Sequence, residues 1–261
     1  MHIEAILNSV TEQGQATVPE GWGQGRAAFG GLLAALLYQH AAITVAKDQV
    51  LRSFSLSFVA PVAPGGLSIH SEVLRQGKSV LQVQVTARQA QQVAAVMLLS
   101  FGAARPSELH VPAAAAPAMK TPQHSQILPF IKGMTPDFLA HIELAWAQGD
   151  MPFTGSETPD FAGHMRYREP LSATSIAAFI GLVDAWPPSL LPMFKRPAPA
   201  SSLTWTMELV GDPTLYVGDS WWQYQVITDH CADGYGQSRA SVWSPDGQLM
   251  ALNRQTVTVF T

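Results

Sequence analysis

The feature that most constrains this 261-residue chain is an internal repeat. Each copy consists of an apolar segment with the character of a helix, followed by four strand-like runs. The predicted helices span residues 30–45 and 174–186. The predicted strands begin at residues 51, 67, 79 and 92 in the first copy and at residues 201, 221, 236 and 248 in the second. A repeat of this kind predicts two similar units that pack together, each with its own helix.

The two copies differ in where they place polar residues. When they are aligned, Leu51 falls opposite Ser202 and Leu99 falls opposite Gln255. The second helix also contains a carboxylate, Asp184, whereas the first helix contains no acidic residue. Because polar residues replace apolar ones in only one of the two copies, the repeat indicates a single functional site in the second copy.

The composition favours a folded domain with a large core and excludes several kinds of partner. Of all residues, 47% are hydrophobic and only 13% are charged, which argues against disorder. The net charge is −4, without runs of Lys or Arg, so the chain lacks the clustered cations that nucleic acid binding requires. A single cysteine, Cys231, excludes an internal disulfide and a cysteine-based zinc site, and the eight histidines show no metal-ligand spacing.

The N-terminal sequence MHIEAILNSV has no basic region followed by an apolar one, so no signal peptide is predicted. The longest apolar stretch is interrupted by Tyr38, Gln39 and His40 and is too short to span a membrane. We therefore expect a cytoplasmic protein that does not associate with membranes.

Alternation of side chains identifies the strands. Leu81, Val83 and Val85 fall on one face of their run and the intervening polar residues on the other, which is typical of a strand with one solvated side. Pro- and Gly-containing turns separate the runs, which favours an antiparallel sheet. Both helices are apolar nearly all round, which indicates burial on most sides.

These patterns predict an α+β fold in which two sheet-wrapped helices share one continuous sheet. The predicted domains are an N-terminal unit at residues 1–104, a Pro/Ala-rich linker at 105–136 and a C-terminal unit at 137–261 that carries the functional residues. Residues 138–146 and 163–169 are interpreted as further strands of the second unit. Their expected counterparts in the first unit are residues 2–7 and 15–18.

Several segments together resemble one enzyme family. In the first half they are AFGGLL, LRSFSLSFVAPV, EVLRQGKSV and LLSFGA, and in the second half LVDAW, SSLTWTMEL and DGQLMALNRQTV. In order and spacing they resemble the acyl-CoA thioesterase II (TesB-like) family of double-hotdog enzymes, over residues 20–105 and 160–260. The resemblance implies hydrolysis of an acyl-CoA substrate without a metal or bound cofactor, and assembly into a homo-oligomer.

The resemblance also implies a water-orienting Asp–Thr–Gln set, which falls on Asp184, Ser202 and Gln255. Ser202 departs from the usual Thr but keeps its hydroxyl. Leu32 occupies a position where many relatives have Gln after the glycine pair, so the role of that side chain is not carried over to this chain.

The chemistry of these side chains fits the hydrolysis of a thioester. Asp184 follows a run of apolar helical residues, where burial would tune a carboxylate to act as a general base. Gln255 can donate to and accept from a bound water at once. Simple alternation places Ser202 on the face opposite Trp205, unless a β-bulge re-aims it. The alternative for Asp184 is that it reaches solvent at the end of the helix. The alternatives for Gln255 and Ser202 are that the first has a structural role and the second is an ordinary strand serine.

Gly30 and Gly31 open the first helix. Unpaired backbone N–H groups at a helix start favour negative charge, and glycine lets a ligand approach closely. The resemblance to double-hotdog enzymes implies that the helix start of one unit faces the acid of the other, so we expect this helix start to polarise the thioester carbonyl. The alternative is that the two glycines only allow close packing of the helix.

Other motifs in the sequence are weak. Residues 23–28 fit GxGxxA, but no βαβ unit surrounds them, so a dinucleotide site is not predicted. No GxSxG nucleophile elbow occurs, which argues against a serine esterase. Basic residues that could contact the CoA phosphates, among which the sequence gives no preference, are Arg26, Arg52, Lys78 and Arg254.

The predicted function is hydrolysis of an acyl-CoA to a carboxylic acid and CoA. Direct attack by the Asp184 carboxylate, which would give an anhydride, is an alternative to attack by water. A hotdog hydratase or dehydratase is a second alternative, although the DxNPxH-like segment expected of one is not present. A non-catalytic acyl-CoA-binding protein is the third. The sequence predicts neither the acyl chain length nor the number of subunits.

Overall fold

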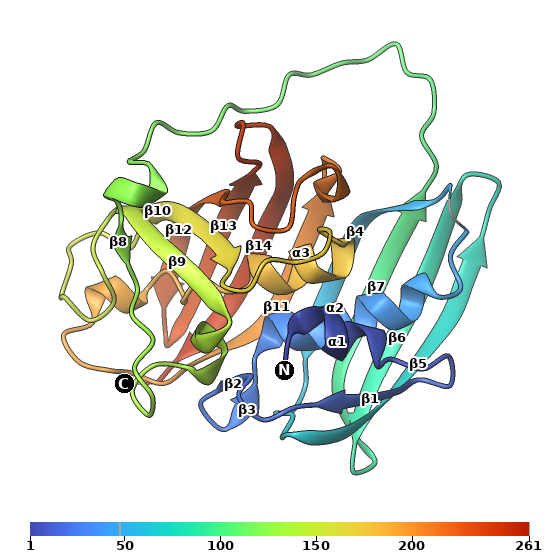
Figure 1. Ribbon diagram of the computed structural model, residues 1–261, viewed down its shortest axis with the longest axis horizontal. Helices are drawn as coiled ribbons and strands as arrows, with labels where there is room; N and C mark the ends of the chain where they lie inside the picture. Colours follow the sequence, from blue (N-terminus) through green and yellow to red (C-terminus); the bar gives the residue numbers. More distant parts are fainter. Residues whose placement is uncertain (47, 261) are drawn as a thin grey trace.

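The computed structural model describes residues 1–46 and 48–260. It is built on a twelve-stranded antiparallel sheet that curls around two central helices (Figure 1). The strand order is β1-β5-β6-β7-β4-β11-β14-β13-β12-β10-β9-β8. The first unit contributes β1 (Gln15–Val18), β4 (Val50–Phe58), β5 (Gly65–Gln76), β6 (Val80–Gln89) and β7 (Gln92–Gly102). The second contributes β8 (Gln126–Ile127), β9 (Ile142–Gln148), β10 (Phe161–Tyr167), β11 (Ala200–Leu209), β12 (Trp222–Ala232), β13 (Tyr235–Trp243) and β14 (Leu249–Val259).

Short elements complete the fold. The helices are α1 (Ile3–Asn8), α2 (Gly30–Ala42) and α3 (Ile176–Val183), and a small hairpin of β2 (Gly23–Gln24) and β3 (Ala27–Ala28) precedes α2. Single 3₁₀ turns occur at η1 (Pro122–His124), η2 (Asp137–Ala140), η3 (Leu191–Met193) and η4 (Pro213–Leu215). Antiparallel pairing of β4 with β11 joins the two units into one sheet.

The predicted repeat is present down to the irregularities of its strands. The β4–β7 pair shifts register between Leu51 and Ser53, and the β11–β14 pair shifts at the equivalent place, between Ser202 and Thr204. The β5–β6 and β12–β13 pairs, and the β6–β7 and β13–β14 pairs, also have matching register shifts. Because a β-bulge redirects the side chains that follow it, the two units place equivalent residues on equivalent faces.

Both central helices are buried, as their apolar sequences predict, although each is shorter than its apolar segment. The α2 helix ends at Ala42 and α3 at Val183. The side chain of Ser175 caps the start of α3 by accepting a hydrogen bond from the backbone N–H of Ala178. The two helices pack against each other where glycines remove the side-chain bulk, at Gly31 and Gly181.

The prediction of a strand at residues 2–7 is wrong, because Ile3–Asn8 forms the helix α1. Its buried residues are Ile3, Ile6 and Leu7, which follow the i, i+3, i+4 spacing of a helix face rather than the alternation of a strand. The other expected counterpart, Gln15–Val18, is strand β1. The predicted strand at 138–146 begins later, at Ile142, after the turn η2.

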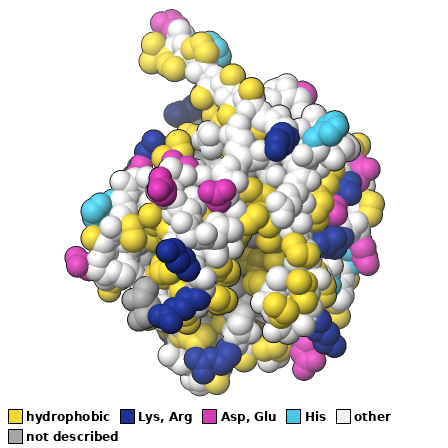
Figure 2. Space-filling view, turned by 90° about the vertical axis from the view of Figure 1, so that its left-hand side faces the viewer, with side chains coloured by type: hydrophobic (Ala, Val, Ile, Leu, Met, Phe, Trp, Pro, Cys, Tyr) yellow, Lys and Arg dark blue, Asp and Glu magenta, His cyan; other side chains and the backbone are white. Residues whose placement is uncertain are grey.

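The segment between the units is largely extended and crosses over one end of the molecule (Figure 1). It stands out from the body at the top of Figure 2, and its side chains Leu109 and Val111 are each 87% exposed. Its last part joins the second unit, since β8 pairs with β9. Within the described residues, no helix is long and apolar enough to cross a membrane.

The close crossing of α2 and α3 makes Gly31 sensitive to substitution. A Cβ atom at Gly31 would lie 2.5 Å from the carbonyl oxygen of Gly181 and 2.5 Å from the ring of Phe29. Alanine alone stabilises a helix by up to about 1 kcal/mol over glycine, but overpacking costs about 1–3 kcal/mol. Gly31→Ala is therefore expected to lower the free energy of unfolding, measured with urea.

The control is Gly66→Ala, because a Cβ atom at Gly66 meets no heavy atom within 4 Å. This substitution should change the unfolding free energy by no more than about 0.5 kcal/mol, as surface changes usually do. A Gly31→Ala protein that is as stable as the control would contradict the close crossing of the helices.

Candidate active site

The candidate site lies where the two units meet, at the end of α3 and the start of α2. Asp184 is the residue directly after α3, and Gln255 lies on β14 with its side chain toward the helices. The Gln255 amide Nε2 donates a hydrogen bond to Oδ1 of Asp184 at 2.7 Å. The acid and the amide predicted from the sequence are therefore in direct contact.

Ser202 extends this contact. Its hydroxyl donates to Oε1 of Gln255 across a long distance of 3.5 Å. Simple alternation would place Ser202 opposite Trp205, but the register shift between Ser202 and Thr204 is a β-bulge that puts both residues on the same face. The three side chains form a chain of hydrogen bonds in which the Gln255 oxygen accepts from the serine and its nitrogen donates to the acid.

The environment of Asp184 favours its protonated form. The side chain keeps some contact with solvent, but protein surrounds most of it, and this burial raises the pKa of the carboxyl to about 7. Hydrogen bonds from the Gln255 side chain and from the backbone N–H of Gly31 act in the opposite direction and limit the rise in pKa. The carboxyl therefore changes charge near neutral pH, where an acid–base catalyst is most effective.

The start of α2 faces this carboxyl from the other unit. No side chain caps the helix at Phe29, the N–H of Gly31 is directed at the Asp184 carboxyl, and the N–H of Leu33 donates to the backbone carbonyl of Phe29. The first turn of a helix therefore presents N–H groups here that favour an anion or a polarised oxygen. Leu32, the residue after the glycine pair, is fully buried.

Glycine is needed at the start of α2 because the acid comes so close. A Cβ atom at Gly30 would lie 2.8 Å from Oδ2 of Asp184 and 3.1 Å from the ring of Phe58. A larger residue would push the helix start and the carboxyl apart. The structure thus brings together all five residues that the sequence singled out: Gly30, Gly31, Asp184, Ser202 and Gln255.

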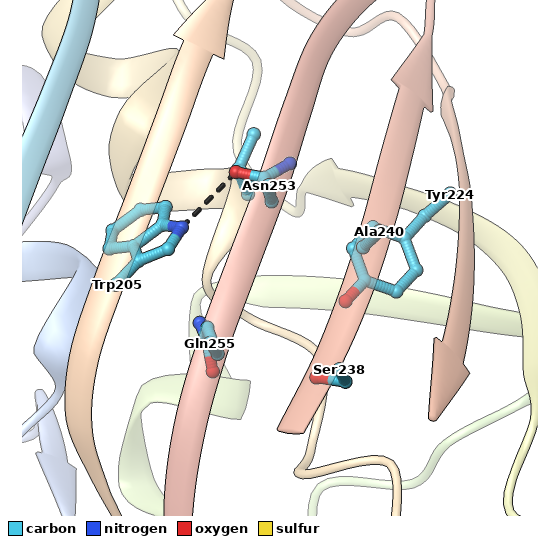
Figure 3. A pocket seen from close by; sticks show the side chains of 7 residues that line it. Trp205, Tyr224, Ser238, Ala240, Asn253 and Gln255 are labelled. Atoms are coloured by element: carbon cyan, nitrogen blue, oxygen red, sulfur yellow. Dashed lines mark hydrogen bonds between the residues drawn. The ribbon is translucent and has the colours of Figure 1, made fainter. Parts of the chain in front are cut away.

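A small polar cavity adjoins the Gln255 side chain, on the inner face of β11, β12, β13 and β14 (Figure 3). Its volume is about 10 Å³, and it is lined by Val183, Trp205, Tyr224, Ser238, Ala240, Asn253 and Gln255. Tyr224, Ser238 and Asn253 were not among the functional residues predicted from the sequence. The alignment of the two copies contains the signal, since it sets each of these residues opposite an apolar one.

The four basic residues considered for the CoA phosphates lie in different surroundings. Arg26 occupies the turn of the β2–β3 hairpin that leads into α2. Arg52 donates to the carbonyl of Gly102, and Arg254 forms an ion pair with Asp229 at 2.7 Å. Lys78 lies in the exposed turn between β5 and β6. Of the four, Arg26 lies nearest in the chain to the α2 start.

Across residues 1–46 and 48–260, no three His, Cys, Asp or Glu side chains gather in a geometry that could hold a metal ion. The polar groups at the site are a carboxyl, an amide, a hydroxyl and backbone N–H groups. Such a set can hold a water molecule, remove a proton from it and polarise a carbonyl oxygen.

Comparison with known proteins identifies the family. Residues 18–102 match the family model of the acyl-CoA thioesterase N-terminal domain, and residues 112–259 match that of the acyl-CoA thioesterase C-terminal domain. A search of curated protein sequences finds no match to this chain.

Solved structures share the fold over the whole chain. A hot dog fold protein of unknown function from Alicyclobacillus acidocaldarius is 20% identical with a TM-score of 0.88, covering 100% of this chain and 99% of its own. Acyl-CoA thioesterase II TesB2 from Mycobacterium marinum is 20% identical with a TM-score of 0.79, covering 99% of this chain and 98% of its own. These likenesses confirm the predicted double-hotdog fold. Given the two family models, this chain belongs to the acyl-CoA thioesterase family and is a thioester hydrolase.

Proposed function

We propose that this protein hydrolyses an acyl-CoA to a free carboxylic acid and CoA, with Asp184 as the general base. Water held by Gln255 and Ser202 attacks the thioester carbonyl carbon while Asp184 accepts its proton. The tetrahedral intermediate then collapses, the C–S bond breaks, and the CoA sulfur leaves with the proton from Asp184. The observation that carries the proposal is the 2.7 Å hydrogen bond between Gln255 and the carboxyl of Asp184, which faces the start of α2.

The α2 start supplies the second requirement, a positive dipole for the developing oxyanion. Its unpaired backbone N–H groups are fixed before the substrate arrives, so they stabilise negative charge without rearranging. The N–H of Gly31 is already directed at Asp184. We infer that the N–H of Gly30, one residue earlier, receives the carbonyl oxygen, so that each unit contributes one half of the site.

The choice of acyl-CoA as substrate follows from the family, and the residue roles follow from the geometry. Assembly of copies into a homo-oligomer and a cytoplasmic location stay predictions from the sequence. The domain boundaries at residues 104 and 136 also stay predictions from the sequence.

Removing the base should abolish turnover without preventing binding. Asp184→Asn keeps the size of the side chain and an oxygen that can accept from Gln255, but it cannot take a proton. We expect kcat to fall by a factor on the order of 10²–10⁴, with KM changed only a few-fold, as loss of a general base usually produces. The measurement is release of free thiol from a panel of acyl-CoAs.

The matched control for this charge change is Glu72→Gln, an exposed acid on β5. It should leave kcat within a factor of two or so, because surface charges away from a site have small effects. A full rate for Asp184→Asn would exclude this residue as the base. Absence of thiol release by the wild-type protein on every acyl-CoA would exclude the proposed substrate class.

The proposed base also predicts the pH dependence of the reaction. Since burial raises the pKa of Asp184 to about 7 and the ionised form is the active one, kcat should fall about tenfold per pH unit below that value and level off above it. Initial rates between pH 5 and pH 9 measure this profile. A rate that does not change over that range would contradict the assignment.

The same pKa predicts that Asp184 destabilises the fold at high pH. Between about pH 4 and pH 7 the folded carboxyl retains a proton that the unfolded chain has released, so the free energy of unfolding falls as pH rises through this window. The stability of Asp184→Asn relative to wild type should therefore rise between pH 4 and pH 8, by roughly 2–4 kcal/mol. Urea unfolding at pH 4 and pH 8 tests this, and an equal difference at both values would contradict it.

A further inference from the structure

The difference between the two units extends beyond the residues of the proposed mechanism. The strand registers pair Leu99 with Val83, and Gln255 with Ser238, so the repeat sets Val83 opposite Ser238. Two further strand positions on the inner face change in the same way. Four apolar residues of the first unit, each at most 2% exposed, correspond to polar residues in the second unit. Ile69 corresponds to Tyr224, Val83 to Ser238, Met97 to Asn253, and Leu99 to Gln255.

These four polar residues line one cavity, the chamber of about 10 Å³ beside the Asp184–Gln255 pair (Figure 3). Four separate replacements of apolar by polar residues at one place are costly to a core unless the polar groups find partners. Only Gln255 is used by the proposed mechanism. Of the other three, Asn253 has a buried polar atom that lacks a partner among the described residues.

Asn253 shows what a ligand of this chamber must offer. The indole Nε1 of Trp205 donates to Oδ1 of Asn253 at 3.1 Å, which fixes the orientation of the amide. The amide nitrogen then points away from Trp205 (Figure 3) and is buried without a hydrogen-bond partner among the described residues. A buried donor without a partner destabilises the fold, because it has lost its hydrogen bonds to water. The missing partner is an acceptor oxygen.

The chamber's dimensions limit that oxygen to a small group. A volume of about 10 Å³ is close to what one water-sized oxygen needs. Tyr224, stacked on Trp186 with ring centroids 5.2 Å apart, points its hydroxyl toward Ser238 and closes one side (Figure 3). An alkyl chain that entered this space would leave the polar groups of Tyr224, Ser238 and Asn253 unpaired.

Resting on the proposed acyl-CoA hydrolase activity, we propose that this chamber binds an oxygen substituent on C3 of the acyl chain, through the amide nitrogen of Asn253. The enzyme would then select 3-hydroxyacyl or 3-oxoacyl thioesters over unsubstituted ones.

The position of the oxygen substituent on the acyl chain follows from the spacing of residues along β14. Asn253 and Gln255 are two residues apart on one face of β14, roughly 7 Å along the strand. Attacking water lies roughly 3 Å from the carbonyl carbon in a reactive complex. Each side chain also makes a hydrogen bond of about 3 Å to its own group, so an oxygen on C3 can reach Asn253 while the water stays on Gln255.

The test compares kcat/KM for butanoyl-CoA and for each enantiomer of 3-hydroxybutanoyl-CoA, which differ only in the hydroxyl. We expect wild type to prefer one hydroxylated enantiomer by at least about tenfold, since a site built to hydrogen-bond a hydroxyl rejects the analogue that lacks it. Asn253→Met, which installs the residue of the first unit, should remove this preference, so that the three substrates react with similar kcat/KM.

The control is Met207→Leu. Met207 is fully buried and pairs with Asn253 across β11 and β14, but it does not line the chamber. This volume-conserving change should keep the preference for the hydroxylated substrate. If Asn253→Met does not fold, Asn253→Ala removes the same donor without added bulk and should give the same loss of preference.

Two outcomes would overturn the inference while the hydrolase activity stands. Equal kcat/KM for butanoyl-CoA and both hydroxylated enantiomers in wild type would show that the chamber does not recognise the substituent. A preference that survives in both Asn253 variants would show that another residue is responsible. Absence of thiol release from any acyl-CoA would instead remove the proposed function, and this inference with it.

Discussion

The site depends on holding one carboxyl out of bulk water at the junction of two units. The hydrogen bond from Gln255 on β14 and the backbone N–H of Gly31 in the other unit offset part of the cost of burying Asp184. That arrangement requires the two central helices to cross closely, which the glycines at positions 31 and 181 permit. The packing of the core and the pKa of the acid therefore have the same structural origin.

Duplication explains why the protein has two equivalent units but a single candidate site. The first unit kept an apolar inner face, where Leu99 and Met97 are buried in the core, and it contributes the start of its helix. The second unit placed Gln255 and Asn253 at the equivalent positions and contributes the acid. Neither unit holds the whole set of groups, so the proposed chemistry requires the continuous sheet formed by β4 and β11.

Much of this arrangement could be predicted from the sequence, because alternation and repeat alignment report on burial. They indicated the strands, the buried helices and the fact that Leu99 and Gln255 occupy equivalent positions in the two copies. Alternation failed for Ser202, since a bulge is set by the register of the neighbouring strand and not by local sequence. The correspondence between the two copies failed at residues 2–7, where a short helix packs its three apolar residues at helical spacing. The chamber around Asn253 was missed because it forms from four strands at once, although the repeat alignment contains its signal.

The most direct test of this account converts Gln255 to the residue of the first unit. Gln255→Leu removes the donor to Asp184 and the acceptor for Ser202, and its matched control is Leu99→Met in the apolar frame. Single-turnover thiol release should slow by about 100-fold or more in the Gln255 variant, as loss of one preorganised donor typically produces, and stay near the wild-type rate in the control. A Gln255→Leu protein that folds and turns over within a few-fold of wild type would contradict the account.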